Sequence, residues 1–271
     1  MKAGSRIINE LTNTEIISTA ATARLCATLV LQKIVTERPA IVLIRSGRKQ
    51  ITRGPRTICL NAGEAVMVPT ALAFDLMNTP IGGQFITTMI NPAQYIIDTV
   101  AEDFGDVPGI RDAQPIRDIE PDLLSSFDRA VFSQLEHSQV PQKVAENRVQ
   151  EVLIWLAHKG YKFGNDRNAN LTQRVRTIVC QDLGRAWKAR EVADLVAMSE
   201  ATLRRRLAQQ GLSFQQVLID IRMTRAVALL QVTDLAIGQI AINVGYDSPS
   251  RFAARFKTRF GFPPSAVRAD N

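Results

Sequence analysis

The hydrophobic pattern in the C-terminal part of the chain predicts two similar helix–turn–helix units. They span 189–210 and 237–260, and in each a short amphipathic helix is followed by a turn and a second, basic helix. The residues between them, 214–230, contain neither Gly nor Pro and predict one continuous helix of about 25 Å. Two helices that enter successive major-groove segments on one face of DNA lie about 34 Å apart, so a single chain could read two adjacent segments.

The second helix of each unit separates an apolar side from a basic side. Leu203 and Leu207 in the first unit are an i, i+4 pair that predicts a buried face, and Phe252 and Phe256 are the matching pair in the second. Arginine and lysine residues occupy the remaining positions of both helices in large numbers. Each unit can therefore present one short basic helix to a major groove of DNA.

All of the net positive charge belongs to this part of the sequence. Residues 171–271 contain 15 Lys and Arg against 8 Asp and Glu, whereas residues 1–170 contain 18 of each, and the whole chain carries +7. A basic surface of this kind binds any duplex through counterion release, and base contacts must then supply specificity. The alternative is a helical bundle with a solvated basic face, but the repeated arrangement of scaffold helix, turn and basic helix favours DNA binding.

Over 171–268 the chain resembles the AraC/XylS family of transcription regulators. The most specific parts of this resemblance are the stretches 244–248, 251–257 and 260–265. Two positions depart from the family pattern. Pro249 stands where a polar residue is usual, and Ala254 stands where some members have a base-contacting arginine. The base preference of the second unit is therefore the part of the resemblance that transfers least directly.

The resemblance implies a sequence-specific transcription regulator, more often an activator in this family, that binds double-stranded promoter or operator DNA and works with RNA polymerase. It also implies which side chains face the DNA. Those expected to contact bases are Ala201, Arg204, Arg205, Ser250, Arg251 and Ala254. Those expected to contact phosphates are Thr202, Arg206, Ser248, Arg255, Lys257 and Arg259.

The N-terminal part has the pattern of a small β domain. Short β-branched or aliphatic runs are separated by turn residues, and they predict strands at 25–33, 40–45, 50–52, 57–60, 64–68 and 84–90. Strands of this length and spacing indicate a small barrel or jelly roll. Their order resembles the cupin-type sensor of the AraC family. The expected fold class is therefore α+β, with a cupin-like β-barrel sensor and helices followed by an all-α domain of two helix–turn–helix units joined by a long helix.

Two amphipathic helices are predicted between the strands and the DNA-binding part, at 121–137 and 142–159. In the family such helices commonly form a homodimer interface; the alternative is that both simply pack on the barrel. The polar residues that follow predict a linker. The expected domains are 1–160, a linker at 161–170, and 171–271.

The sequence offers little for catalysis. A cupin metal site needs several imidazoles, but the chain has only His137 and His158, both outside the predicted strands, so we expect no metal, no cofactor and no enzymatic activity. Cys26, Cys59 and Cys180 are widely spaced among apolar neighbours and are expected to be buried thiols. Neither a signal peptide nor a membrane segment is evident, which favours a bacterial cytoplasmic, nucleoid-associated protein.

A small molecule is the expected partner of the N-terminal domain. Cationic residues among apolar strands suit an anionic ligand such as a fatty or aromatic acid, as the resemblance implies, and Lys33 and Arg45 are the preferred pair because each ends an aliphatic run. The simpler alternative is that these residues face water. Two further alternatives stay open: a partner protein could control the N-terminal domain, or that domain could be a cupin-like enzyme with a DNA-binding tail.

Overall fold

The computed structural model describes residues 18–70, 72–135, 138–164 and 171–267. They form two compact units, one made of 18–30 and 38–164 and the other of 31–37 and 171–267. The prediction assigned 31–37 to the N-terminal domain, whereas the structure groups this segment with the C-terminal helices. His137 and most of the expected linker lie outside the described residues.

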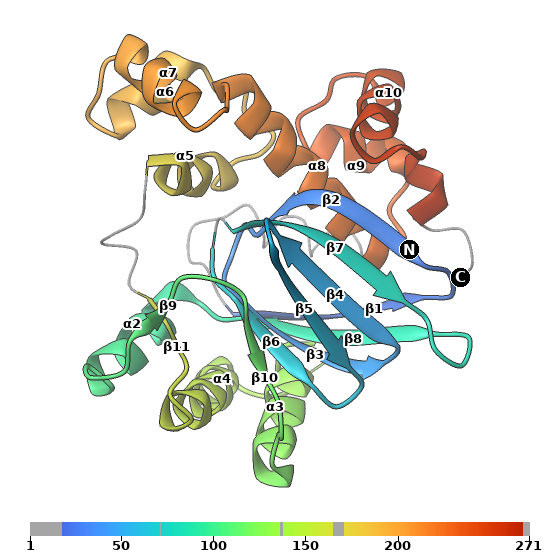
Figure 1. Ribbon diagram of the computed structural model, residues 1–271, viewed down its shortest axis with the longest axis vertical. Coiled ribbons are helices and arrows are strands. Elements are labelled where there is room, and N and C mark those ends of the chain that lie inside the picture. Colours follow the sequence, from blue (N-terminus) through green and yellow to red (C-terminus); the bar gives the residue numbers. More distant parts are fainter. Residues whose placement is uncertain (1–17, 71, 136–137, 165–170, 268–271) are drawn as a thin grey trace. The chain divides into compact units, whose positions relative to one another are not determined.

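The strands of the N-terminal half form two main sheets (Figure 1). They are β1 (Thr19–Leu25), β2 (Leu29–Val35), β3 (Ala40–Ser46), β4 (Arg48–Arg53), β5 (Arg56–Asn61), β6 (Ala65–Val68), β7 (Ala73–Thr79), β8 (Phe85–Asn91), β9 (Gly109–Ile110), β10 (Gln114–Ile116) and β11 (Lys162–Phe163). One sheet has the order β1-β8-β3-β6-β10 and the other the order β2-β7-β4-β5, while β11 pairs with β9 in a small parallel ladder.

The two sheets stay separate, so the β domain is not the closed barrel of the prediction. The chain passes between sheets where β3 ends and β4 begins, and Gly47 stands at that point with a φ of +83°. A Cβ atom on Gly47 would lie 2.6 Å from the carbonyl oxygen of Thr79, and the ring of Phe85 would be 2.9 Å away. Only glycine fits this crossing, because the backbone is left-handed and the neighbouring strands leave no room.

The predicted strand at 25–33 is wrong. Residues 26–28 are an exposed turn, with β1 before it and β2 after it. Leu25 and Leu29 are buried on either side of the turn, which preserves the alternation of each strand. A turn without Gly or Pro gives no signal in the sequence, and for the same reason β1 was not predicted.

Three helices cover one face of the five-stranded sheet. They are α2 (Gln94–Asp103), α3 (Pro121–Ser133) and α4 (Gln142–His158). Figure 1 shows α3 and α4 beside β3, β6 and β10. Ile41, Leu43 and Met67 of the sheet share a buried core with Phe127 of α3 and Val152 of α4. The two predicted amphipathic helices are therefore confirmed, and both bury an apolar stripe against the sheet.

The C-terminal half is helical, as predicted. Its elements are α5 (Leu171–Cys180), α6 (Ala189–Leu195), α7 (Glu200–Ala208), α8 (Phe214–Val232), α9 (Ile237–Asn243), α10 (Pro249–Phe260) and the 3-10 turn η2 (Pro264–Val267). Helices α6 and α7 lie at one end of α8, and α9 and α10 lie at the other (Figure 1). At 1.5 Å per residue, α8 spans about 28 Å. The first helix–turn–helix unit shares its core with α5 and the first half of α8.

The segment 31–37 is fastened to the C-terminal helices of its unit by polar contacts. The backbone N–H of Val35 donates to Thr224 Oγ1 (3.2 Å), and the carboxylate of Glu37 pairs with Arg225 (3.6 Å). Ile34 and Val35 are buried. The last residues of β2 thus belong to the structural unit that contains both helix–turn–helix motifs.

The cysteines differ from the prediction of three buried thiols. Cys26 and Cys59 are exposed, because Cys26 stands in the turn between β1 and β2 and Cys59 faces outward from β5. Cys180, at the end of α5, is partly covered, and burial raises the pKa of its thiol well above the usual value. The prediction therefore holds best for Cys180.

Candidate nucleic-acid interface

The first helix–turn–helix unit is built on a left-handed turn and a serine cap. Helix α6 ends at Leu195; Ala197, two residues later, has a φ of +57°, and the N–H of Met198 donates back to the carbonyl oxygen of Ala193 (2.9 Å). This pairing is the usual way to satisfy the free carbonyls of a helix end. Ser199 then caps α7 by accepting a hydrogen bond from the N–H of Thr202 (3.2 Å). The cap fixes the point at which the recognition helix begins.

The second unit repeats this construction. Gly245 has a φ of +79°, and the N–H of Tyr246 donates to the carbonyl oxygen of Ala241 (2.9 Å). Ser248 caps α10 through the N–H of Arg251 (3.4 Å). The second turn is one residue longer than the first, because Asp247 precedes its serine cap. The two units are therefore similar in plan but not identical in the path that leads into the recognition helix.

Most of the side chains expected to contact DNA, through bases or phosphates, are exposed on the two recognition helices. On α7 the exposed positions are Ala201, Arg204, Arg205 and Arg206. On α10 they are Ser250, Arg251, Ala254, Arg255 and Lys257. The buried positions between them are Leu203, Leu207, Phe252 and Phe256, so the apolar pairs predicted for these helices are confirmed. Each helix thus carries these exposed cations on the side away from its buried apolar pair.

Some of these residues already have partners within the protein. Arg204 forms an i, i+4 ion pair with Glu200 (2.7 Å), which places its guanidinium along the surface of α7. The Thr202 hydroxyl is hydrogen-bonded to that of Ser199 (2.9 Å), and the Ser248 hydroxyl is used in capping. Arg205 and Arg251 project from the centre of one recognition helix and the start of the other.

Arg259 is not placed to bind a phosphate. Its guanidinium is 11% exposed and forms an ion pair with Asp220 of α8 (3.1 Å), which is 5% exposed. It also donates to the carbonyl oxygen of Lys33 (2.8 Å). Nothing in the sequence next to Arg259 indicates this pairing. A single acidic residue in the apolar run 214–230 was the available signal, since a buried carboxylate needs a cation.

A chain of aromatic rings holds α10 on its unit. Phe252 contacts Phe256 at a centroid distance of 5.7 Å, and Phe256 contacts Phe260 at 4.7 Å and Phe262 at 6.1 Å. Tyr246 of the turn lies edge-on to Phe252 (5.7 Å). Helix α10 ends at Gly261, which has a φ of +86°. The basic side of α10 therefore rests on a well-packed support.

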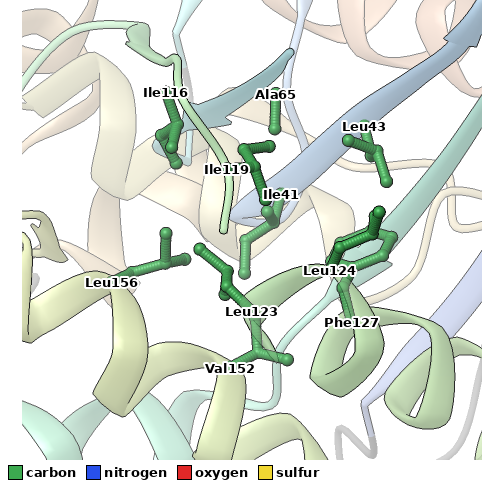
Figure 2. A pocket seen from close by; sticks show the side chains of 10 residues that line it. All are labelled: Ile41, Leu43, Ala65, Ile116, Ile119, Leu123, Leu124, Phe127, Val152 and Leu156. Carbon is green, nitrogen blue, oxygen red and sulfur yellow. The ribbon is translucent and has the colours of Figure 1, made fainter. Parts of the chain in front are cut away.

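A small apolar cavity lies in the N-terminal unit, between the five-stranded sheet and helices α3 and α4. All ten of its lining residues are apolar, and Figure 2 shows them converging from both sides. Leu43 of β3 and Phe127 of α3 are among them. Arg45 follows on the same strand, with its guanidinium 5.7 Å from the centroid of the Phe127 ring. The guanidinium of Arg45 thus stands beside one wall of an apolar cavity.

Arg45 and Lys33, the two preferred effector residues, differ in their surroundings. Arg45 donates through Nε to Thr88 Oγ1 (3.0 Å) and forms an ion pair with Asp128 of α3. Lys33 lies inside β2 rather than at its end, has an exposed side chain and a φ of +51°, and does not line the cavity. The two residues also belong to different units, Lys33 to the one with the C-terminal helices and Arg45 to the N-terminal one.

One cation that the sequence did not single out is buried. Lys49 of β4 is 7% exposed, donates to Asn78 Oδ1 (2.8 Å) and lies 5.4 Å from the centroid of the Phe85 ring. Burial lowers its pKa from 10.5 to about 7. The signal available in the sequence was the alternation with Ile51, which places Lys49 on the inward face of the strand.

The described residues contain no cluster of three His, Cys, Asp or Glu side chains that could hold a metal ion. None of the helices placed by the structure has both the length and the apolar character needed to cross a membrane.

Comparison with known proteins agrees with the geometry of the C-terminal unit. Residues 192–270 match the family model of a helix-turn-helix domain. The chain is 39% identical over 93 residues to the HTH-type transcriptional activator FapR of Escherichia coli, and 40% identical over 92 residues to the transcriptional regulator SirC of Salmonella typhimurium. Each match covers 34% of this chain, and it spans 36% of FapR and 31% of SirC.

The fold of nearly the whole chain is similar to solved structures of ToxT from Vibrio cholerae. The fatty-acid-bound form superposes with a TM-score of 0.68 over 94% of this chain and 95% of that chain, at 16% identity. A second crystal form gives the same score at 15% identity. The superposition shows a shared fold, and at this level of identity it shows nothing more. That fold is a β-rich domain that is not a closed barrel, followed by a helical helix–turn–helix domain.

Proposed function

We propose that the protein is a sequence-specific transcription regulator that reads two adjacent segments of promoter or operator DNA, because its C-terminal unit contains two helix–turn–helix motifs and matches the family model of a helix-turn-helix domain. The observation that carries this proposal is the matched exposure of cations on α7 and α10, each backed by a buried apolar pair. The curated relatives include a transcriptional activator, and we propose activation, in contact with RNA polymerase, as its mode of action.

We assign base reading to one face of each recognition helix. Arg205 and Arg251 are the central residues; a bidentate arginine–guanine pair contributes about 1–3 kcal/mol of discrimination. Ala201, Arg204, Ser250 and Ala254 complete the two faces. Arg206, Arg255 and Lys257 are assigned to phosphates, together with the N-terminal residues Thr202 and Ser248. Arg259 does not belong to this group, because its guanidinium is ion-paired with Asp220.

The test is capture of genomic DNA fragments by the purified full-length protein, compared with Arg205→Ala and Arg251→Ala. We expect enrichment of a motif with two boxes about ten base pairs apart. Each variant should lose the box that its own helix reads. Exposed Arg24 on β1 supplies the matched control, and Arg24→Ala should capture the same fragments as the wild type. Capture without any sequence preference would reduce the C-terminal unit to a non-specific DNA anchor.

We further propose that the N-terminal unit senses a small apolar acid, with the acyl or aryl group in the cavity and the carboxylate on Arg45. An arginine beside an apolar cavity offers the two features that such a ligand needs. The cavity is small, so the ligand would enlarge it by moving α3, and its carboxylate would replace Asp128 on Arg45. The ToxT structure of similar fold contains an unsaturated fatty acid, which suggests the ligand class.

Titration with a long-chain unsaturated fatty acid tests this site. Trp155 of α4 packs against the core around the cavity and provides a fluorescence signal. Loss of a charge-assisted contact of about 1.5–3 kcal/mol should weaken binding by Arg45→Gln roughly ten- to hundredfold. Lys33→Gln, the other residue indicated by the sequence, should bind as the wild type does. The reverse order of effects would move the site to Lys33, and no binding at all would favour control by a partner protein.

We also propose that the protein forms a homodimer through the helices in 121–159. The hairpin of α3 and α4 exposes Phe132 (59%), Leu135 (45%) and Val144 (41%), which cluster around the end of α3 and the start of α4. Analytical ultracentrifugation should show a dimer that Phe132→Ser dissociates. A wild-type protein that sediments as a monomer would contradict the proposed dimer interface. We place the protein in the bacterial cytoplasm and assign it no catalytic activity.

A further inference from the structure

One side chain of α8 bonds to the backbone of both helix–turn–helix units. Arg222 donates through Nη1 to the carbonyl oxygen of Gly245 (3.1 Å), in the turn of the second unit. Through Nη2 it donates to the carbonyl oxygen of Arg185 (2.9 Å), in the loop that leads into α6 of the first unit. A single planar guanidinium therefore spans the junction between the units.

The junction is closely packed around this guanidinium. A Cβ atom on Gly245 would lie 2.6 Å from Arg222 Nη2 and 2.6 Å from the carbonyl oxygen of Leu183. The turn of the second unit thus approaches the backbone of the first unit more closely than any side chain would permit. The ring of Tyr246 lies 6.0 Å from the Arg222 guanidinium and closes the site from another side.

The loop that accepts this hydrogen bond is itself fixed to the first unit. Trp187 donates through Nε1 to the carbonyl oxygen of Asp182 (2.7 Å), and the Arg185 guanidinium stacks 4.4 Å from the Trp187 ring centroid. Arg185 also pairs with Glu191 of α6 (3.7 Å). Any rotation of the second unit about α8 would therefore have to break the Arg222 contacts or drag this loop with it.

We propose that Arg222 is a positioning residue that fixes the separation and rotation of α7 relative to α10, and so determines the spacing at which two DNA boxes can be read together. The inference rests on the proposed reading of DNA by both helices. Arg222 is itself about half-buried and engaged on both sides, so it acts through the turn that precedes α10. Lysine can reproduce this role only in part, because it lacks the planar fork that reaches two carbonyl oxygens at once.

The experiment measures binding to the captured two-box sequence, to versions with one or two base pairs added or removed between the boxes, and to each box alone. The wild type should prefer the original spacing at least about tenfold, which corresponds to 1.4 kcal/mol. Arg222→Met keeps the aliphatic stem but loses both hydrogen bonds. It should bind the original spacing about tenfold more weakly, accept the altered spacings almost equally well, and bind single boxes as the wild type does.

Two further variants keep the result interpretable. Arg174→Met removes an exposed arginine of α5 and should leave every affinity unchanged. Arg222→Lys retains the charge and should give an intermediate spacing preference, which provides a test if Arg222→Met does not fold. The inference is overturned if an Arg222 variant keeps the full spacing preference, or weakens single boxes as much as double ones. If the wild type enriches no motif, the proposed function fails instead.

Discussion

Lys49→Met is expected to make the stability of this protein respond differently to pH. The ammonium group of Lys49 is buried between a strand partner and a ring, with Asn78 Oδ1 at 2.8 Å as its hydrogen-bond acceptor. Burial lowers its pKa from 10.5 to about 7, because the surroundings offer the charge much less solvation than water. Methionine has a similar length and carries no proton.

The sign and size of the effect follow from this pKa. Between pH 7 and 10.5 the unfolded chain binds a proton at Lys49 that the folded chain releases, so the free energy of unfolding rises with pH in this window. Well inside this window, Lys49 alone raises the free energy of unfolding by about 1.4 kcal/mol per pH unit. Below pH 7 both states are protonated, and the full penalty of the buried charge is present.

Urea unfolding at pH 6, 7, 8 and 9 measures the effect as the difference between Lys49→Met and the wild type, in which all other titrations cancel. The advantage of the variant should be largest at pH 6 and should shrink by up to about 1.4 kcal/mol for each unit above pH 7. Lys143→Met removes a lysine whose side chain is 80% exposed and is the matched control. A difference that stays constant from pH 6 to 9 would refute the account of Lys49.

Four other substitutions test the C-terminal unit by unfolding experiments. Ala197→Gly should stabilise the protein by up to about 1 kcal/mol, because a left-handed alanine is strained; a loss of stability would show that the turn is not strained. Asp220→Ala should cost about 3–5 kcal/mol by leaving Arg259 buried without its carboxylate, whereas a change under 1 kcal/mol would mean that water solvates the pair. Ser199→Ala and Ser248→Ala should each cost about 1 kcal/mol, and thermal midpoints unchanged in both would rule out a capping role.

The sequence was sufficient for the helix–turn–helix units because their signals are local. Ser199 and Ser248 mark the start of the two recognition helices. On α10, Phe252 and Phe256 mark the buried side within a few residues of the cap. The role of Arg259 could not be read in the same way, because its partner lies 39 residues away on another helix. Pairings over such distances depend on tertiary packing, which local periodicity does not encode.

In the N-terminal unit the same limit applies to whole strands. Strand β1 pairs with β8 over a long sequence separation, and no Gly or Pro marks the turn at Cys26 that separates β1 from β2. The division of the strands between two sheets depends on the crossing at Gly47, which the sequence presents only as one more turn. The burial of Lys49 is hard to read from the sequence because its charge favours an exposed position, although its alternation with Ile51 places it on the inward face of β4.

Because 31–37 belong to the C-terminal unit, the DNA-binding half cannot be expressed as one continuous C-terminal fragment without losing part of its structure. A fragment that starts at the interdomain linker would lack this stretch, so Thr224, Arg225 and Arg259 would each lose a contact, and the apolar surface under Ile34 and Val35 would be laid bare. Such a fragment is expected to aggregate more readily than its composition suggests. For the same reason, an exchange of the C-terminal helices for those of another protein should include 31–37, or else keep the groups that contact Thr224, Arg225 and Arg259.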